Sequence, residues 1–281
     1  MEARMSKDAW NIFWRHGLGD GACLPGAVDA NTRLQQYWTT FAGNFEAPSH
    51  VVDLACGGGI VARRLAESND QISVTGVDYA DVPATDQDRV ELKSGVDMAK
   101  MPFDDASFDG AVSQFGVEYG DAGKVGNELA RVLRPGAPFA FIIHHGESAV
   151  VANNAARAKV LDAVTADNVR EVYVAGDRQA LAKAMFDIRL HADRKDVVDE
   201  IARGLGQSMI NATGDRAEAW TEFERLANGE RAILGALHKA AVDKPEAWLD
   251  QLGTAFEAEG ISVFRDSRDA PIAWSIFGRR A

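Results

Sequence analysis

Short runs of β-branched and other apolar residues alternate with helical stretches through the middle of the chain. The runs predict strands at 50–54, 72–77, 89–93, 107–113 and 137–144. Between them, apolar residues recur at helical spacing near 60–68 and 121–133. Strands that alternate with helices of this length form a parallel sheet covered on both faces. The pattern therefore predicts an α/β fold with a doubly wound sheet.

An amphipathic segment precedes the first strand. Residues 6–44 predict two helices joined by a glycine-rich loop, and the second helix carries apolar residues at helical spacing: Leu34, Tyr37, Trp38 and Phe41. We expect residues 1–48 to form a helical lid in which Trp14, Tyr37 and Trp38 exclude water from a bound ligand. The alternative is that these aromatic side chains belong to the core.

The strand pattern stops after Gly146, and helical periodicity continues to about Pro245. Because a connection of this length is uncommon inside a compact domain, residues 147–244 are predicted to form a helical insert that caps the substrate. Its apolar residues predict either a roof over the substrate or a contact in a homodimer: Met185, Phe186, Ile188, Leu190, Met209 and Ile210.

The last part of the chain returns to the sheet pattern. A helix begins at Pro245, with Trp248, Leu252 and Phe256 expected on its buried side. Strands at 261–266 and 272–278 are joined by a short link, which predicts an antiparallel hairpin. These strands complete a mostly parallel seven-stranded sheet, in a domain made of residues 49–146 and 245–281.

Charge and composition narrow the classes of function. The 281 residues include 30 Lys plus Arg and 42 Asp plus Glu, for a formal net charge of −12. This acidic chain lacks the basic surface that nucleic-acid binding requires. It has neither an apolar stretch long enough for a membrane span nor a signal-peptide core, so we expect a cytoplasmic protein without a membrane partner. The two cysteines, Cys23 and Cys56, lack metal spacing, and no metal site is predicted.

The most informative stretch is VVDLACGGGIVARRLA at 51–66. A predicted strand ends near Leu54, three glycines follow, and a helix begins at Ile60. Glycines at such a junction adopt positive φ angles and let a ligand approach bare backbone amides. Because ligands bind at the carboxyl edge of a parallel sheet, this loop predicts a cofactor site.

Two classes of cofactor fit the loop on its own. Gly57, Gly59 and Ala62 match G-x-G-x-x-A, and Asp78 follows 21 residues after Gly57, which is the dinucleotide arrangement. Against this class, the acidic Asp53 ends the first strand, where a dinucleotide fold runs from apolar strand directly into glycine.

Further motifs favour the second class, because the chain resembles class I S-adenosylmethionine-dependent methyltransferases. D-L-A-C-G-G-G at 53–59 resembles the first motif of that family, and V-D-Y at 77–79 resembles the second. The segments 95–109 and 128–137 resemble the family's later motifs, in the correct order. Ala55 replaces the first glycine of the first motif, as in methyltransferases that resemble the quinone-biosynthesis C-methyltransferases.

The resemblance implies roles for individual residues. Asp53 would face the positively charged methionine end of the cofactor, Asp78 would accept its ribose hydroxyls, and Asp97 would accept its adenine amino group. Met98 would pack on the adenine ring, and the Ser113 carbonyl would hold the methionine amino group. The remaining residues of the predicted cofactor site are Ala55, Cys56, Gly57, Gly59 and Tyr79.

The expected reaction is an in-line displacement that transfers a methyl group to a small organic acceptor. His144 and His145 end the fifth predicted strand, and strand alternation points only one of them toward the site as a candidate base. A structural histidine is the alternative for each. The predicted acceptor contacts are Gln114, Glu118, Tyr119 and Trp38, and Glu118 has a solvated loop charge as its alternative. An NAD(P)-dependent oxidoreductase and a non-catalytic cofactor-binding protein remain the rival functions.

Overall fold

The computed structural model describes residues 7, 10–11, 28–211 and 215–281. The predicted lid residue Trp14 lies outside these described residues, as does Cys23. The described chain divides into two compact units, one formed by residues 151–239 and the other by the described residues on either side of that segment. The second unit contains the sheet and is called the sheet unit below.

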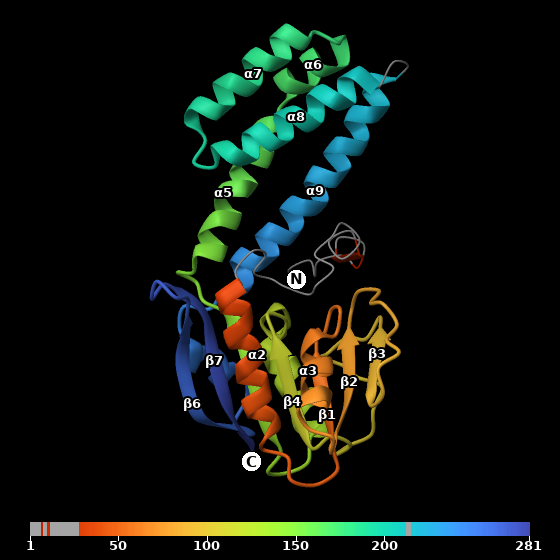
Figure 1. The fold of residues 1–281 in the computed structure, drawn as a ribbon, viewed down its shortest axis with the longest axis vertical. Helices are drawn as coiled ribbons and strands as arrows, with labels where there is room; N and C mark the ends of the chain where they lie inside the picture. The colour runs from red at the N-terminus through yellow and green to blue at the C-terminus, as the bar shows by residue number, and fades with distance from the viewer. Residues whose placement is uncertain (1–6, 8–9, 12–27, 212–214) are drawn as a thin grey trace. The chain divides into compact units, whose positions relative to one another are not determined.

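The sheet has seven strands in the order β3-β2-β1-β4-β5-β7-β6 (Figure 1). The strand bounds are β1 Ser49–Leu54, β2 Ile72–Asp78, β3 Val90–Ser94, β4 Gly110–Gln114, β5 Pro138–His144, β6 Phe256–Arg265 and β7 Pro271–Arg280. The first five strands run parallel, whereas β7 is antiparallel to both β5 and β6. The predicted doubly wound, mostly parallel sheet with a C-terminal antiparallel hairpin is confirmed.

The strand order reverses between β1 and β4, since β1 pairs with β2 on one side and β4 on the other. Ligands of doubly wound folds bind outside the carboxyl ends of the strands at such a switch point. The glycine-rich loop follows β1 directly, so the topology places it at this position.

Two helices cover one face of the sheet, α2 (Val28–Ala42) and α3 (Ile60–Ser68). Trp38 of α2, Leu65 of α3 and Val112 of β4 are buried in one apolar cluster on this face. The second predicted N-terminal helix is therefore a structural layer of the sheet unit, with its aromatic stripe in the core. The proposed lid role of residues 1–48 stays a prediction.

The opposite face is covered by α4 (Ala122–Val132) and α10 (Pro245–Leu252). Leu129 and Trp248 are buried here in a second apolar cluster. Alternate residues of β5 enter the two clusters, as expected for a strand buried on both faces. Figure 1 shows α2 and α3 in front of the sheet.

The predicted helical position of Phe256 is wrong. The helix α10 ends at Leu252 because Gly253 adopts φ 107°, and Phe256 instead begins β6. Phe256 is still buried, because that strand returns to the same apolar cluster. Strand β6 begins five residues earlier than predicted, and β7 is longer than predicted at both ends.

The unit of residues 151–239 is helical throughout its described part. The helices that contribute to it are α5 Ala149–Val164, α6 Asp167–Ala175, α7 Arg178–His191, α8 Lys195–Asn211 and α9 Arg216–Ala240. Tyr173 and Trp220 are fully buried in a core of its own. Of the apolar residues expected to form a roof, Met185 and Met209 belong to this core, whereas Phe186, Leu190 and Ile210 are exposed. No helix in the described ranges is long and apolar enough to cross a membrane.

Candidate functional site

The glycine-rich loop uses left-handed backbone conformations between β1 and α3. Ala55, Gly57 and Gly59 have φ angles of 51°, 50° and 74°. A Cβ atom on Gly59 would lie 2.8 Å from the Leu92 side chain, whereas one on Gly58 would meet nothing within 4 Å. With its positive φ angle, Ala55 adopts a left-handed conformation that usually favours glycine. The loop keeps its shape despite the departure from the family's first glycine.

Asp78 ties the loop to the end of β2. One carboxylate oxygen of Asp78 accepts the Gly57 N–H at 2.8 Å, and the other accepts the Ala80 N–H at 2.8 Å. The side chain is buried, and burial raises the pKa of its carboxyl above the usual value. Each oxygen keeps a further lone pair for a ligand hydroxyl. Asp78, which is predicted to bind the ribose, thus also fixes the glycine-rich loop through its hydrogen bond with Gly57.

Asp53 is the second buried carboxyl group beside the loop, with 1% of its surface exposed. It accepts the Ala62 N–H of α3 at 3.2 Å. Burial, with a smaller contribution from the nearby charge of Asp78, raises the pKa of Asp53 to about 8. Burial also raises the pKa of the Cys56 thiol well above its ordinary value. Cys56 is accordingly a packing residue that stays protonated at neutral pH.

The other predicted cofactor residues lie on turns and strand ends of the same unit. Asp97 accepts the Ala99 N–H at 2.9 Å, and the Met98 side chain packs against the second apolar cluster. Tyr79 follows Asp78 and is half-buried. The fully buried Ser113 hydroxyl donates to the Leu54 carbonyl and accepts the Val117 N–H, both at 2.9 Å. Its side chain therefore fastens β4 to neighbouring elements, and the predicted role of its carbonyl stays a prediction.

Glu118 and His144 meet at the carboxyl ends of β4 and β5. Glu118 lies on a short 3-10 helix, η1 (Val117–Tyr119), and His144 is the last residue of β5. One Glu118 oxygen, Oε1, lies 2.7 Å from His144 Nδ1 and accepts the His144 backbone N–H at 3.0 Å. The two side chains are 0% and 1% exposed. The alternative prediction of a solvated Glu118 is therefore wrong, since the short helix folds it under the strand ends.

His145 takes a different environment from His144. Its ring stacks on Trp274 of β7 at a centroid distance of 4.4 Å, and its Nδ1 accepts the Glu147 N–H at 3.1 Å. Burial lowers the pKa of His145. The ring of His144 lies instead against Phe115 and Tyr119, at centroid distances of 4.5 and 6.0 Å. The two histidines thus have separate ring partners, as strand alternation predicts.

Trp10 contacts a predicted acceptor residue, Tyr119, although the sequence-based site prediction did not include Trp10. Its ring meets Tyr119 edge to face at 5.1 Å. Lys7 pairs with Asp81 at 2.6 Å, and the Asn11 side chain exchanges two hydrogen bonds of 2.8 Å with Asp81. These contacts place the described N-terminal residues beside the turn after β2 and the helix η1. In the sequence, the only indication of these contacts is that the N-terminal segment is rich in tryptophan.

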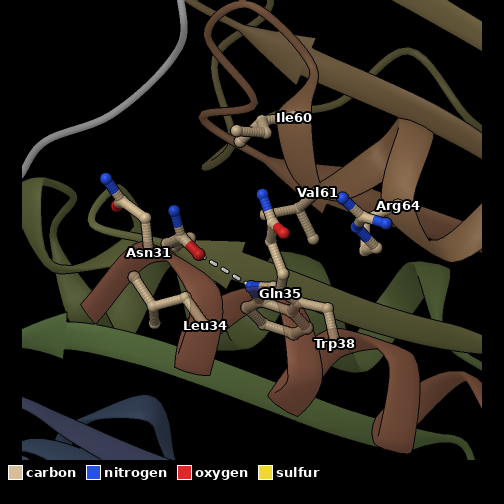
Figure 2. Close-up of a pocket in the computed structure, with 8 residues that line it drawn as sticks. Asn31, Leu34, Gln35, Trp38, Ile60, Val61 and Arg64 are labelled. Carbon is tan, nitrogen blue, oxygen red and sulfur yellow. Dashed lines mark hydrogen bonds between the residues drawn. The ribbon is translucent and has the colours of Figure 1, made fainter. Parts of the chain in front are cut away.

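A hollow lies between α2 and α3, next to the end of β4 (Figure 2). The residues that line it are Asn31, Leu34, Gln35, Trp38, Ile60, Val61, Arg64 and Gln114. The Trp38 indole donates to the Gln114 side-chain oxygen at 2.7 Å, the dashed line in Figure 2. Two predicted acceptor contacts are thus brought together. Asn31 and Gln35 were missed, although their helical spacing to Trp38 places all three on one face of α2.

The described residues contain no group of three or more His, Cys, Asp or Glu side chains suited to hold a metal ion.

Comparisons with known proteins bear on the same region. Residues 52–141 match a protein family described as a methyltransferase domain. No curated protein matches the chain.

Among solved structures, a SAM-dependent methyltransferase from Aquifex aeolicus is 12% identical, with 98% of this chain and 99% of that chain covered and a TM-score of 0.47. A SAM-dependent methyltransferase from Methanosarcina mazei is 16% identical, with 86% and 96% covered and a TM-score of 0.43. A geranyl diphosphate methyltransferase in complex with GPP and sinefungin is 14% identical, with 89% and 78% covered and a TM-score of 0.40.

Likenesses of this degree carry no argument about activity, and the assignment rests on the matched segment and its motifs. The resemblance to quinone-biosynthesis enzymes is not confirmed. Over residues 52–141 the chain matches the methyltransferase domain family, and its motifs there resemble those of class I S-adenosylmethionine-dependent methyltransferases.

Proposed function

We propose that the sheet unit binds S-adenosylmethionine at the carboxyl ends of β1 and β2 and transfers its methyl group to a small organic acceptor. The single observation that carries this proposal is the pair of buried carboxyl groups, Asp53 and Asp78, at the glycine-rich loop. Burial raises the pKa of both groups, so the site favours a ligand that brings positive charge and hydroxyl donors. A sulfonium compound with a ribose has both properties.

The residues around the loop fit the parts of this cofactor. Asp53 would hold the cationic methionine end, and Asp78 would accept the ribose hydroxyls with its remaining lone pairs. Asp97 and Met98 would contact the adenine base. The loop backbone at Gly57 and Gly59 carries no side chain, which would allow the cofactor to approach it closely.

For methyl transfer, the protein must mainly align the acceptor with the methyl carbon and exclude water. When bound, S-adenosylmethionine supplies an electrophilic methyl carbon. The chain's own task is then to hold an acceptor in line with that carbon at the ends of β4 and β5. Gln114 is the last residue of β4, and its side chain is fixed by Trp38, which supports both as acceptor contacts.

The hollow between α2 and α3 is the proposed place for part of the acceptor. Leu34, Ile60 and Val61 give it apolar walls, while Gln35 and Gln114 provide amide groups. Asn31 and Arg64 also line the hollow, so this lining suits a small organic molecule with both apolar and polar groups. The role of residues 147–244 as a substrate cap remains part of this proposal.

The ribose role of Asp78 is testable by calorimetric titration with S-adenosylhomocysteine. We expect Asp78→Ala to weaken binding about 10- to 100-fold, because two hydrogen bonds to a charged group are lost. Asp70→Ala is the matched control, since Asp70 is an exposed aspartate near the opposite end of β2. Thermal unfolding of each variant checks that the loop is still folded. Unchanged affinity in a folded Asp78→Ala protein would remove Asp78 from the ribose site.

A further inference from the structure

The pair formed by Glu118 and His144 contains two buried polar atoms that have no hydrogen-bond partner. These atoms are Glu118 Oε2 and His144 Nε2. Burying a polar atom without a partner costs free energy, and native structures keep few such atoms. The pair also lies at the carboxyl edge of the sheet, where the proposed methyl transfer takes place. Its unused atoms therefore point to a ligand.

The hydrogen bonds of Glu118 decide which histidine nitrogen is free to act. Glu118 Oε1 accepts the His144 backbone N–H, and it lies 2.7 Å from Nδ1. A carboxylate can only accept, so the ring proton of a neutral imidazole is placed on Nδ1. His144 Nε2 then carries a lone pair and can accept a proton. The same carboxylate stabilises the imidazolium that forms when it does.

The surroundings of His144 favour an aromatic acceptor. Phe115 and Tyr119 lie against its ring, and Trp10 meets Tyr119 edge to face. Phe115 also belongs to the apolar cluster that contains Trp38, which lines the hollow between α2 and α3. Because Nε2 is not exposed to solvent, the acceptor must displace part of this aromatic cover to reach it. In the described part of the chain, the titratable groups that contact His144 are Glu118 and Tyr119.

We propose that His144 is the general base for a phenolic hydroxyl acceptor and that Glu118 is its positioning residue, which makes the reaction an O-methylation. This inference rests on the proposed methyltransferase function. A neutral amine attacks through a lone pair it already has, whereas a hydroxyl must lose its proton to become a strong nucleophile. A phenol, with a pKa of about 10, is matched to an imidazole base far better than an aliphatic alcohol is.

Proton transfer and methyl transfer occur in one step, in which every proton and electron pair is accounted for. His144 Nε2 takes the hydroxyl proton, and the oxygen uses a lone pair to form the new O–C bond. The electron pair of the breaking S–C bond stays on sulfur, which becomes a neutral thioether. The imidazolium, held by Glu118, afterwards releases its proton to water.

The first test needs no acceptor and no cofactor. Nitrogen-15 NMR of the histidine rings, with His144 assigned from the missing signals of His144→Gln, reports which nitrogen carries the proton. We expect the Nδ1–H tautomer at His144 in the wild-type protein above neutral pH, and loss of this preference in Glu118→Ala. An Nε2–H tautomer in the wild type would overturn the proposal.

The second test measures formation of S-adenosylhomocysteine with a panel of small substituted phenols and a matched panel of anilines. We expect turnover of phenols, with a rate that rises with pH to a plateau. His144→Gln should lower kcat about 10²- to 10⁴-fold with unchanged calorimetric affinity for S-adenosylhomocysteine. Glu118→Gln should move the midpoint of the pH profile to lower pH, because the imidazolium loses its anionic partner, and Glu118→Asp should restore part of the rate.

Controls separate this proposal from the methyltransferase assignment. His191→Gln replaces an exposed histidine of α7 and should leave turnover unchanged. Turnover of phenols by His144→Gln at the wild-type rate would overturn the role of the base, as would transfer confined to anilines. Failure of the wild-type protein to bind S-adenosylhomocysteine in the calorimeter would instead contradict the proposed function itself.

Discussion

Single residues of the proposed site include carboxyl groups that are buried where water cannot stabilise their charge. Asp53 and Asp78 could be singled out from the sequence, because each ends a predicted strand within a motif. The pairing of Glu118 with His144 could not, since 26 residues separate them and only the folded sheet brings them together. The exclusion of Glu118 from solvent likewise depends on the turn of η1.

The raised pKa of Asp53 predicts a pH dependence of stability. Its folded-state pKa of about 8 exceeds the usual 3.8, so between these values the folded protein holds a proton that the unfolded chain releases. The free energy of unfolding should therefore fall as pH rises from about 4 to about 8, by at most about 1.4 kcal/mol per unit from this group. Asp78, whose pKa is also raised, contributes with the same sign.

The matched variant is Asp53→Asn, which keeps an acceptor for the Ala62 N–H but cannot ionise. Urea unfolding at pH 5, 6, 7 and 8 should give a flatter profile for this variant than for the wild type, with the largest gain in stability at pH 8. Parallel profiles would show that Asp53 ionises normally in the folded protein.

At the scale of helices and strands, hydrophobic periodicity predicted the elements better than their ends. The pattern predicts a strand that includes 107–109, but the Phe108 backbone pairs with the end of α4 and with Arg134 just after it. The Asp109 side chain accepts the His50 N–H. The stripe from Pro245 to Phe256 keeps helical spacing across Gly253, so periodicity alone could not show the break. Local backbone conformation and long-range pairing set these ends.

The packing of α4 on α10 depends on one glycine. A Cβ atom on Gly126 would lie 1.8 Å from the Leu252 carbonyl oxygen, whereas one on Gly123 of the same helix would make ordinary contacts beyond 3.5 Å. We expect Gly126→Ala to lower the free energy of unfolding by about 1–3 kcal/mol or more, because the helices must move apart. Gly123→Ala should be neutral or raise it by up to about 1 kcal/mol. Equal effects in urea unfolding would contradict this contact.

At the scale of the whole molecule, the described chain comprises a sheet unit and a helical unit, each with its own core. The domain bounds predicted from the loss of strand pattern after Gly146, with an insert of residues 147–244, stay a prediction. The lid role of residues 1–48 and the cap role of residues 147–244 stay predictions, because the contacts within the two units do not test them. The formal net charge of −12 counts the buried acids of the site as ionised, and it gives no information about the acceptor.

The most direct test of the central claim is a pair of calorimetric titrations of the wild-type protein, one with S-adenosylhomocysteine and one with NAD. We predict saturable binding of S-adenosylhomocysteine at one site per chain, lost or weakened in Asp78→Ala, and no binding of the dinucleotide. Saturable binding of NAD with no response to S-adenosylhomocysteine would contradict it.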